Sequence, residues 1–358
     1  MTDLVGTVHA HARELAALRG EHEAEAQLSA FAVDAIRAAR MLDGLVPKEL
    51  GGLELPPLVY LEVIEALAAA DPATGWCAMT AATSTLLAPY IDPELAATIW
   101  QDKAPFLAGV FAPSGKVTLE QNGVRLAGKW SYASGCRHAE WFVLGAIADG
   151  EHVVAVVPAR DVTIVDNWDV LGLRGSGSHD VTVDVELPTH HLASVFGRPP
   201  WSDAPLYRVP LFGALACGVA ACALGIAHHA LEIALGREPA PAQLAIWARA
   251  WARVDASRAY LHATMIRATQ HAVVSTLPAD AATRGELRLA AVHVAHECAD
   301  VVRELFRLGG GAAIRAGHPL NAALRDIETV LTHRMVAERV LPTAARALLG
   351  LGNRPADL

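Results

Sequence analysis

Residues 168–188 form the segment that most limits what this chain can fold into. The first half, 168–178, is a turn in which three glycines free the backbone and two serines offer hydroxyl donors. In residues 181–187 apolar and polar side chains alternate strictly, which predicts a half-buried β-strand. The spacing Gly172-x-x-Gly175-x-Gly177 is similar to the dinucleotide-binding fingerprint, but that fingerprint opens a helix. Because these glycines precede a strand, the sequence argues against a Rossmann fold.

The composition is that of a globular chain that buries much of its surface. Its 358 residues are 53% hydrophobic and 19% charged, which allows one large domain or two to three modest ones. The formal net charge of −9 argues against nucleic acid and anionic membranes as main partners. Five cysteines without a Cys-x-x-Cys pair argue against disulfides and a thiolate zinc site. A reducing cytoplasm is therefore the expected location.

Two segments bear on membrane targeting. Residues 1–13 carry charges and histidines where a signal peptide has an apolar core. Residues 209–227 are 19 positions without a charge, near the length of a membrane span. This segment is built from Gly, Ala and Cys, and two histidines follow it directly. We therefore expect a buried, closely packed bundle helix and no membrane partner.

Apolar residues recur at helical spacing towards both ends of the chain. Within residues 1–104, the alanine-rich segment 13–40 has this spacing, and Asp71-Pro72 and Asp92-Pro93 are helix-start signals. The same spacing returns in residues 199–358, where proline and glycine clusters interrupt it. The sequence thus predicts an N-terminal helical domain and a C-terminal helical bundle.

The period changes to two in residues 105–198. Asn122-Gly123 and Asp149-Gly150 are each flanked by alternating apolar residues, which predicts two β-hairpins. Together with the strand over 181–187 they make a small antiparallel β-domain. The expected fold class is mainly α-helical with an inserted central β-domain.

Four segments give the chain a resemblance to the acyl-CoA dehydrogenase fold. They are the turn 46–52, the segment 128–141 (GKWSYASGCRHAEW), residues 168–188, and the C-terminal element 318–326 followed by His333. Within this fold the chain looks most like the flavin-dependent monooxygenases of two-component systems, the branch that includes 4-hydroxyphenylacetate and dibenzothiophene monooxygenases. The resemblance implies a homotetramer or homodimer. It also implies a small-molecule substrate and reduced FMN or FAD, which a separate flavin reductase supplies.

The resemblance further implies that the flavin lies against the β-domain. The residues expected to hold the cofactor are Phe111, Ala112, Ser114, Trp130, Ser134, Trp168, Gly175, Ser176 and Ser178. Residues 111–114 would present backbone groups to the pyrimidine edge, Trp130 would wall the ring, and Ser134 would place a hydroxyl near N5. The turn 175–178 would supply donors to the phosphate-bearing tail. The alternative is that Trp130 is a core aromatic residue and the turn only connects strands.

His333 is the candidate acid–base residue. Histidine moves protons near neutral pH, and in the resembling branch a histidine at this place sits over the reactive face of the flavin. Many acyl-CoA dehydrogenases carry Glu-Gly-Thr near this point, whereas this chain reads Leu331-Thr-His-Arg334. The expected reaction is oxygen transfer through a C4a-hydroperoxide, stabilised by Ser134 and His333, to a small aromatic or heteroatom-containing substrate. A histidine with a purely structural role is the alternative, and His138 is a weaker candidate for substrate contact.

Other features leave alternatives open. His293 and His296 lie on one predicted helix without a paired Glu-x-x-His motif, so we expect no metal site. Asn321 and Ala322 stand where the branch has Gln and Arg, and the link 236–243 is shorter than usual. These departures leave open whether FMN or FAD is preferred and whether flavin binds. The alternative functions are an acyl-CoA dehydrogenase-like desaturase and a flavin-free, non-redox biosynthetic protein.

Overall fold

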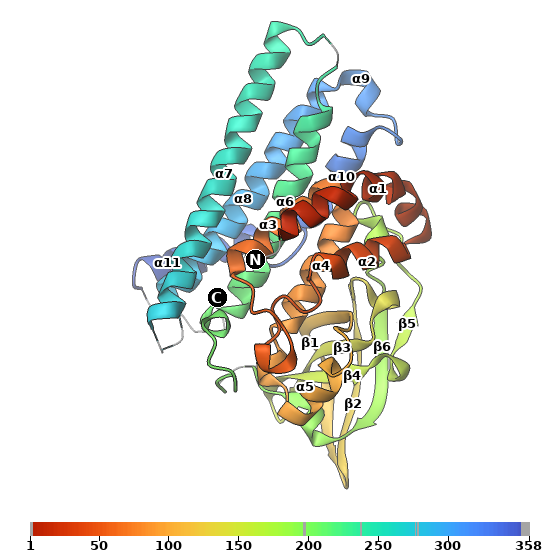
Figure 1. Cartoon of the computed structure of the whole chain (residues 1–358), viewed down its shortest axis with the longest axis vertical. Coiled ribbons are helices and arrows are strands. Elements are labelled where there is room, and N and C mark those ends of the chain that lie inside the picture. The colour runs from red at the N-terminus through yellow and green to blue at the C-terminus, as the bar shows by residue number, and fades with distance from the viewer. Residues whose placement is uncertain (1–2, 196–197, 237, 276, 278, 352–358) are drawn as a thin grey trace.

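A computed structural model describes residues 3–195, 198–236, 238–275, 277 and 279–351. The helices that come first are α1 (Leu4–Glu25), α2 (Ala30–Ala38), α3 (Pro57–Ala70), α4 (Pro72–Thr85) and α5 (Pro93–Trp100). The strands are β1 (Leu107–Glu120), β2 (Gly123–Trp130), β3 (Trp141–Ala148), β4 (Glu151–Pro158), β5 (Thr163–Val165), β6 (Asp180–Leu187) and β7 (Leu192–Ala193). The later helices are α6 (Leu211–Ile233), α7 (Pro241–Val274), α8 (Ala281–Leu308), α9 (Gly310–Ala313), α10 (Pro319–Leu331) and α11 (Leu341–Leu348). This order is the predicted one, with strands between two sets of helices (Figure 1).

The helix starts follow the predicted signals. The Asp71 carboxylate accepts a hydrogen bond from the Thr74 N–H and caps α4, and Asp92 caps α5 in the same way. The segment 13–40, in which helical spacing was predicted, contains the end of α1 and all of α2. Ala26 adopts a left-handed conformation (φ 48°) that ends α1, and the Ser29 hydroxyl then caps α2.

The strands form one mixed sheet in the order β5-β6-β2-β1-β3-β4-β7. Both predicted hairpins are present: β1 pairs with β2 around residues 121–122, and β3 pairs with β4 around Asp149-Gly150. The expectation of a purely antiparallel domain is wrong, because β1 and β3 run parallel. The reason is that β2 occupies one edge of β1, so the chain returns through residues 131–140 to the other edge in the original direction.

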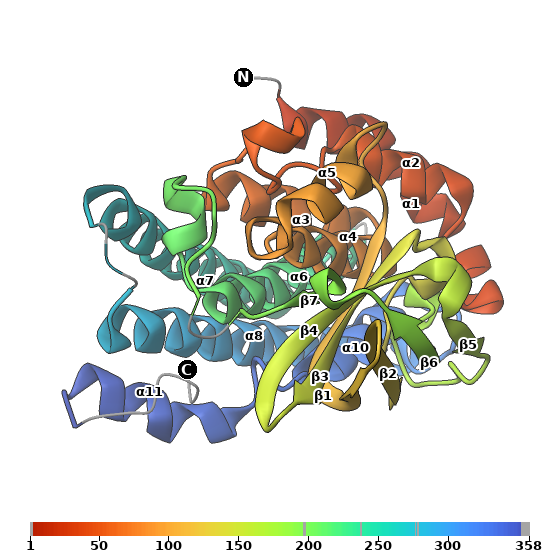
Figure 2. The same cartoon turned by 90° about the horizontal axis from the view of Figure 1, so that it is seen from below.

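Helix α6 joins the two sets of helices into one core. It contacts α3 and α4 on one side and α7, α8 and α10 on the other (Figures 1 and 2). At Gly218 a Cβ atom would lie 2.1 Å from the Tyr60 hydroxyl, so α3 and α6 pack too closely for a side chain there. Of the helices described, α6 is long and apolar enough to cross a membrane, but 83% of its most apolar stretch is buried inside the protein. This is the buried bundle helix that the sequence predicts.

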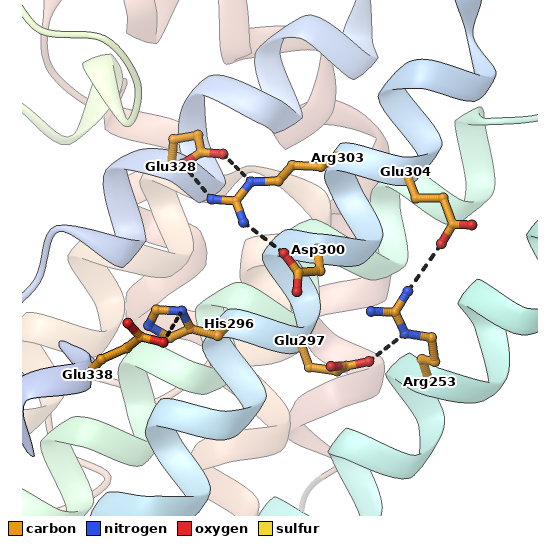
Figure 3. A network of polar contacts seen from close by, with 8 residues as sticks. All are labelled: Arg253, His296, Glu297, Asp300, Arg303, Glu304, Glu328 and Glu338. Atoms are coloured by element: carbon orange, nitrogen blue, oxygen red, sulfur yellow. Dashed lines mark hydrogen bonds and ion pairs between the residues drawn. The ribbon is translucent and has the colours of Figure 1, made fainter. Parts of the chain in front are cut away.

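Charged side chains tie the outer surfaces of the bundle together (Figure 3). Arg253 on α7 forms ion pairs with Glu297 and Glu304 on α8. Arg303 on α8 binds Glu328 on α10 through two hydrogen bonds of 2.7 and 2.9 Å. Because these pairs are partly exposed, each contributes at most about 1 kcal/mol to stability.

The domain limits of 1–104, 105–198 and 199–358 stay a prediction, and both internal limits fall between elements. Helix α5 ends at Trp100 and β1 begins at Leu107, while β7 ends at Ala193 and α6 begins at Leu211. Residues 196–197, beside the second limit, lie outside the described residues, as does residue 237 in the link between α6 and α7.

Candidate functional site

A cavity of about 1650 Å³ opens where the three parts of the chain meet. Its wall includes Trp76 on α4, Phe111 on β1, Leu215 on α6, Arg288 on α8 and Thr329 on α10. Ligand pockets in proteins commonly measure about 300–1,000 Å³. This cavity is therefore large enough for a ring system and a second small molecule beside it.

A row of buried hydroxyl groups lies on the sheet side of the cavity. The Ser134 hydroxyl accepts a hydrogen bond from the Trp76 indole N–H at 3.0 Å, and its Oγ lies 2.8 Å from Ser178 Oγ. Ser178 Oγ lies in turn 2.7 Å from Ser176 Oγ, and all three serines line the cavity. Because either oxygen of each pair can donate, Ser134 can direct its own proton into the cavity when Ser178 donates to it.

The turn that carries two of these serines is held between α1 and α10. The Leu173 N–H donates to Asp326 Oδ1 at 2.6 Å, and a Cβ atom on Gly172 would lie 2.1 Å from the Arg325 carbonyl oxygen. At Gly175 a Cβ atom would lie 2.6 Å from the His22 side chain on α1, so Gly175 is outside the cavity wall. The glycines therefore serve close packing, while Trp168, Leu173 and the two serines of the turn reach the cavity.

His333 lies just beyond the end of α10 and faces the same cavity. Its ring meets the Trp76 ring edge to face, with centroids 5.5 Å apart, and its Nδ1 accepts the Met335 N–H at 3.3 Å. Burial, with the nearby Arg334 and Arg288 cations, lowers the pKa of His333 to about 4. At neutral pH the ring is therefore uncharged and carries its proton on Nε2, where it can donate a hydrogen bond.

The structure brings most of the predicted residues to this one cavity. Those on the wall are Phe111, Ala112, Ser134, Trp168, Ser176, Ser178 and His333. Ser114 is exposed on β1 and lies off the wall. His138 also lies off the wall, where its ring is 6.0 Å from that of Phe106 and burial lowers its pKa. The positions of Ser114 and His138 therefore do not match their predicted roles in contacting the flavin and the substrate.

Trp130 does not line the cavity, so its predicted role as a wall of the flavin ring is wrong. It is fully buried in the core of the sheet, and its indole N–H donates to the Gly145 carbonyl at 2.7 Å. Cβ atoms on Gly115 and Gly128 would each come within 3 Å of its ring, so the tryptophan fills the space over these two glycines. Successive side chains of β2 point to opposite faces of the sheet, and Trp130 points to the packed face and away from the cavity.

Two residues on the wall were missed by the sequence analysis. Trp76 contacts both Ser134 and His333, yet its position in an apolar helix gave no sign of which way it faces. Arg288 follows Leu287 within an apolar run of α8 and is only 5% exposed. A single arginine among apolar neighbours is a signal of a buried charge, and it could have marked this position.

Comparison with known proteins finds that the chain is similar to an acyl-CoA dehydrogenase domain and to monooxygenases. Residues 217–338 match the family described as "Acyl-CoA dehydrogenase, C-terminal domain". Indole-3-acetate monooxygenase of Pseudomonas putida is 29% identical over 92% of this chain and 90% of its own length. The oxygenase component of FADH2-dependent resorcinol hydroxylase of a Rhizobium species is 30% identical over 64% of this chain and 60% of its own.

Solved structures extend the likeness to the whole fold. The 3-HSA hydroxylase from Rhodococcus sp. RHA1 superposes with a TM-score of 0.94 over 100% of this chain and 99% of its own, at 23% identity. XiaF from a Streptomyces species, in complex with FADH2 and glycerol, gives a TM-score of 0.90 at 25% identity, over 98% and 96% of the two chains. The chain thus has the acyl-CoA dehydrogenase fold that its sequence motifs predict, and its homologues are oxygenase components of flavin-dependent monooxygenases.

Proposed function

We propose that this chain is the oxygenase component of a two-component flavin-dependent monooxygenase. It takes reduced FMN or FAD from a separate flavin reductase and uses O2 to oxygenate a small aromatic or heteroatom-containing substrate. The observation that carries the proposal is that Ser134 and His333 both contact Trp76 on the wall of one large cavity. The names of the relatives support the same reaction class.

The cavity fits a flavin in both its size and its lining. Phe111 and Ala112 can present the backbone of β1 to the polar edge of the ring, and Trp168 offers an aromatic surface. Ser176 and Ser178 offer hydroxyl donors at the turn. A bound reduced flavin supplies the oxygen-activating chemistry that the side chains of the protein lack.

The contribution of the protein is to place hydrogen-bond donors and exclude water. Ser134 can donate from its hydroxyl, and neutral His333 can donate from Nε2, so two donors face the cavity without adding a positive charge. Apolar wall residues such as Leu215 and Met335 limit the access of water. Dry surroundings favour oxygen transfer to the substrate over release of hydrogen peroxide.

The desaturase alternative requires a carboxylate that removes a proton from carbon. Among the described wall residues the carboxylates belong to Glu151 and Asp203, and both residues are exposed. His333, with its lowered pKa, is a weak base. The wall is therefore better suited to donate hydrogen bonds to oxygen than to remove a proton from an acyl chain.

Two experiments test this proposal. The protein is first titrated anaerobically with reduced and oxidised FMN and FAD, and the complex with reduced flavin is then mixed rapidly with 18O2 and an aromatic substrate. We expect saturable binding of reduced flavin and one labelled oxygen atom in the product. Bleaching of oxidised flavin by substrate without O2 would favour the desaturase. A protein that binds neither flavin in either redox state would favour the flavin-free alternative.

We also propose that the enzyme is a cytoplasmic homotetramer or homodimer. Helix α7 leaves five large apolar side chains exposed along its length: Leu244, Trp251, Ile266, Val273 and Val274. A second copy packed on this helix would cover them. The five cysteines are free and buried, as suits a reducing compartment. Sedimentation equilibrium measures the assembly, and a monomer at micromolar concentration would contradict it.

A further inference from the structure

The helical side of the cavity carries a cluster of positive charge. Arg284, Arg288, Arg334 and Arg339 all line this part of the wall. In the part of the chain that the structure describes, no ion pair joins any of the four to an acidic side chain. A cluster of like charges around a low-dielectric space attracts anions.

Arg288 is the buried member of this cluster. Its residue is 5% exposed, and one guanidinium nitrogen donates to the Met335 carbonyl at 3.3 Å. Its Nε is buried and has no hydrogen-bond partner among the described residues. Burial and the neighbouring Arg334 lower the pKa of Arg288 to about 10, so it remains charged at neutral pH. An unpaired buried cation is costly to maintain, and an anion in the cavity would offset that cost.

Arg288 is also connected to the candidate reactive centre through one residue. Met335 accepts a hydrogen bond from Arg288 at its carbonyl and donates one from its N–H to His333 Nδ1. An anion held by Arg288 therefore lies close to the turn that carries His333. A planar carboxylate matches the parallel N–H donors of a guanidinium.

We infer that Arg288 binds the carboxylate of an aromatic acid substrate and so directs the aromatic ring of that substrate towards His333 and Ser134. The inference rests on the proposed monooxygenase function for the reaction, but the anion site itself can be measured without flavin. The same charge is carried by the phosphate of a flavin, so the experiment has to distinguish these two sources of anion.

The test measures binding of phenylacetate and of its neutral isostere phenylacetamide to the flavin-free protein by calorimetry. We expect the wild type to bind the acid about 10-fold or more tightly than the amide, the size of one charge-assisted hydrogen bond. Arg288→Met should remove this preference and leave the affinity for the amide unchanged, while Arg288→Lys should retain part of it. Arg307→Met is the matched control, because Arg307 is exposed on the same helix and lies off the wall.

Two outcomes would overturn the inference. If the wild type binds acid and amide equally, or Arg288→Met weakens both equally, Arg288 only holds the turn at Met335. In the second outcome, Arg288→Met still prefers the acid over the amide but binds reduced FMN more weakly than the wild type does. If its affinity for reduced riboflavin, which has no phosphate, is unchanged, Arg288 binds the flavin phosphate. Failure of the wild type to bind any reduced flavin would contradict the proposed function and leave the acid-to-amide ratio as a separate measurement.

Discussion

Trp76 is the residue on which the geometry of the site depends. Its indole N–H binds Ser134, and its ring packs against His333, so one side chain fixes the distance between residues from the β-domain and the last helices. Trp76 is itself buried, with 7% of its surface exposed. Neither Ser134 nor His333 needs to contact the other, because both are placed by the same rigid aromatic ring.

Replacing Ser134 by alanine should affect both stability and coupling. The buried Trp76 N–H would lose its acceptor, which costs about 1–3 kcal/mol of the free energy of unfolding. The donor facing the cavity would also be lost, so more hydrogen peroxide and less product should form per O2 consumed. Oxygen-electrode and product assays measure this ratio. Ser114→Ala is the control, because Ser114 is exposed outside the cavity; equal ratios in both variants would remove Ser134 from the reaction.

Replacing His333 by asparagine should change the dependence of stability on pH. The folded state holds the pKa of His333 near 4, whereas an unfolded histidine titrates near 6.5. Between pH 4 and 6.5 the unfolded chain binds more protons than the folded protein. The stability that neutral His333 provides is therefore fully present above about pH 6.5 and is lost as the pH falls towards 4. The melting temperature of the variant should therefore fall less between pH 7 and 4.5 than that of the wild type.

The same substitution should lower product formation about 10-fold or more, since one preorganised donor is lost. His138→Asn serves as the control, because His138 is another half-buried histidine that lies off the cavity wall. A product yield in His333→Asn that matches the control would contradict the assigned role.

Single residues show the limit of what the sequence could predict at this scale. Ser134 and His333 were predicted because they belong to motifs with a fixed place in the fold, and both line the cavity. Trp130 was misassigned because its motif says nothing about which face of β2 it occupies, and packing over Gly115 and Gly128 decides that. Arg288 was missed because it belongs to no motif.

Among the structural elements, the turn before β6 depends most on its neighbours. It packs so closely on α10 that Gly172 has no room for a side chain, and Asp326 on α10 holds its Leu173 N–H. The position of the two cavity serines in this turn is thus set by helices distant in sequence.

Gly172→Ala should displace the turn, because the new methyl group would meet the backbone of Arg325, which cannot rotate away. We expect a loss of about 1–3 kcal/mol of stability, as for other overpacked sites, and weaker flavin binding. Gly20→Ala is the matched control, since nothing lies within 4 Å of its Cβ position on α1. That variant should be unchanged or slightly more stable. Thermal melts that rank the two variants equally would contradict the close packing.

Asp326→Asn tests the electrostatics of the same contact. Burial raises the pKa of Asp326 to about 7, so the folded state binds more protons than the unfolded state between pH 4 and 7. The stability that the neutral carboxyl provides at low pH is therefore lost as the pH rises through 7. The free energy of unfolding of the asparagine variant, measured relative to that of the wild type, should therefore rise by up to about 4 kcal/mol from pH 4 to pH 8. Chemical denaturation at these pH values measures the difference, and parallel curves would show that Asp326 does not titrate in this way.

Among the elements, those whose formation depends on neighbouring residues in the sequence could be predicted from the sequence. The hairpin at Asp149-Gly150 formed as expected because both turn residues take positive φ angles in the structure. The parallel pairing of β1 with β3 was not predictable in the same way, since it depends on which edge of β1 remains free after β2 has paired. The break at Ala26 was also missed, because alanine gives no sequence signal for a helix end.

The whole molecule is organised around the shared core of α6. Because this helix packs on α3 and α4 as well as on α7, α8 and α10, the two helical parts cannot separate without exposing it. The sheet lines a further side of the cavity through Phe111 and Ala112 of β1, and α4 contacts both α6 and β1. The architecture was predictable from motifs spread along the chain, whereas the lining of the cavity depends on side-chain directions that only the assembled fold determines.

The most direct test of the account is a crystal structure of the protein grown anaerobically with reduced FAD or FMN. We expect the flavin ring in the cavity between the sheet and α10, with Ser134 within hydrogen-bonding distance of it and the ring of His333 on the same side of Trp76. A flavin bound elsewhere on the protein, or a ring that contacts neither Ser134 nor His333, would contradict the proposed function.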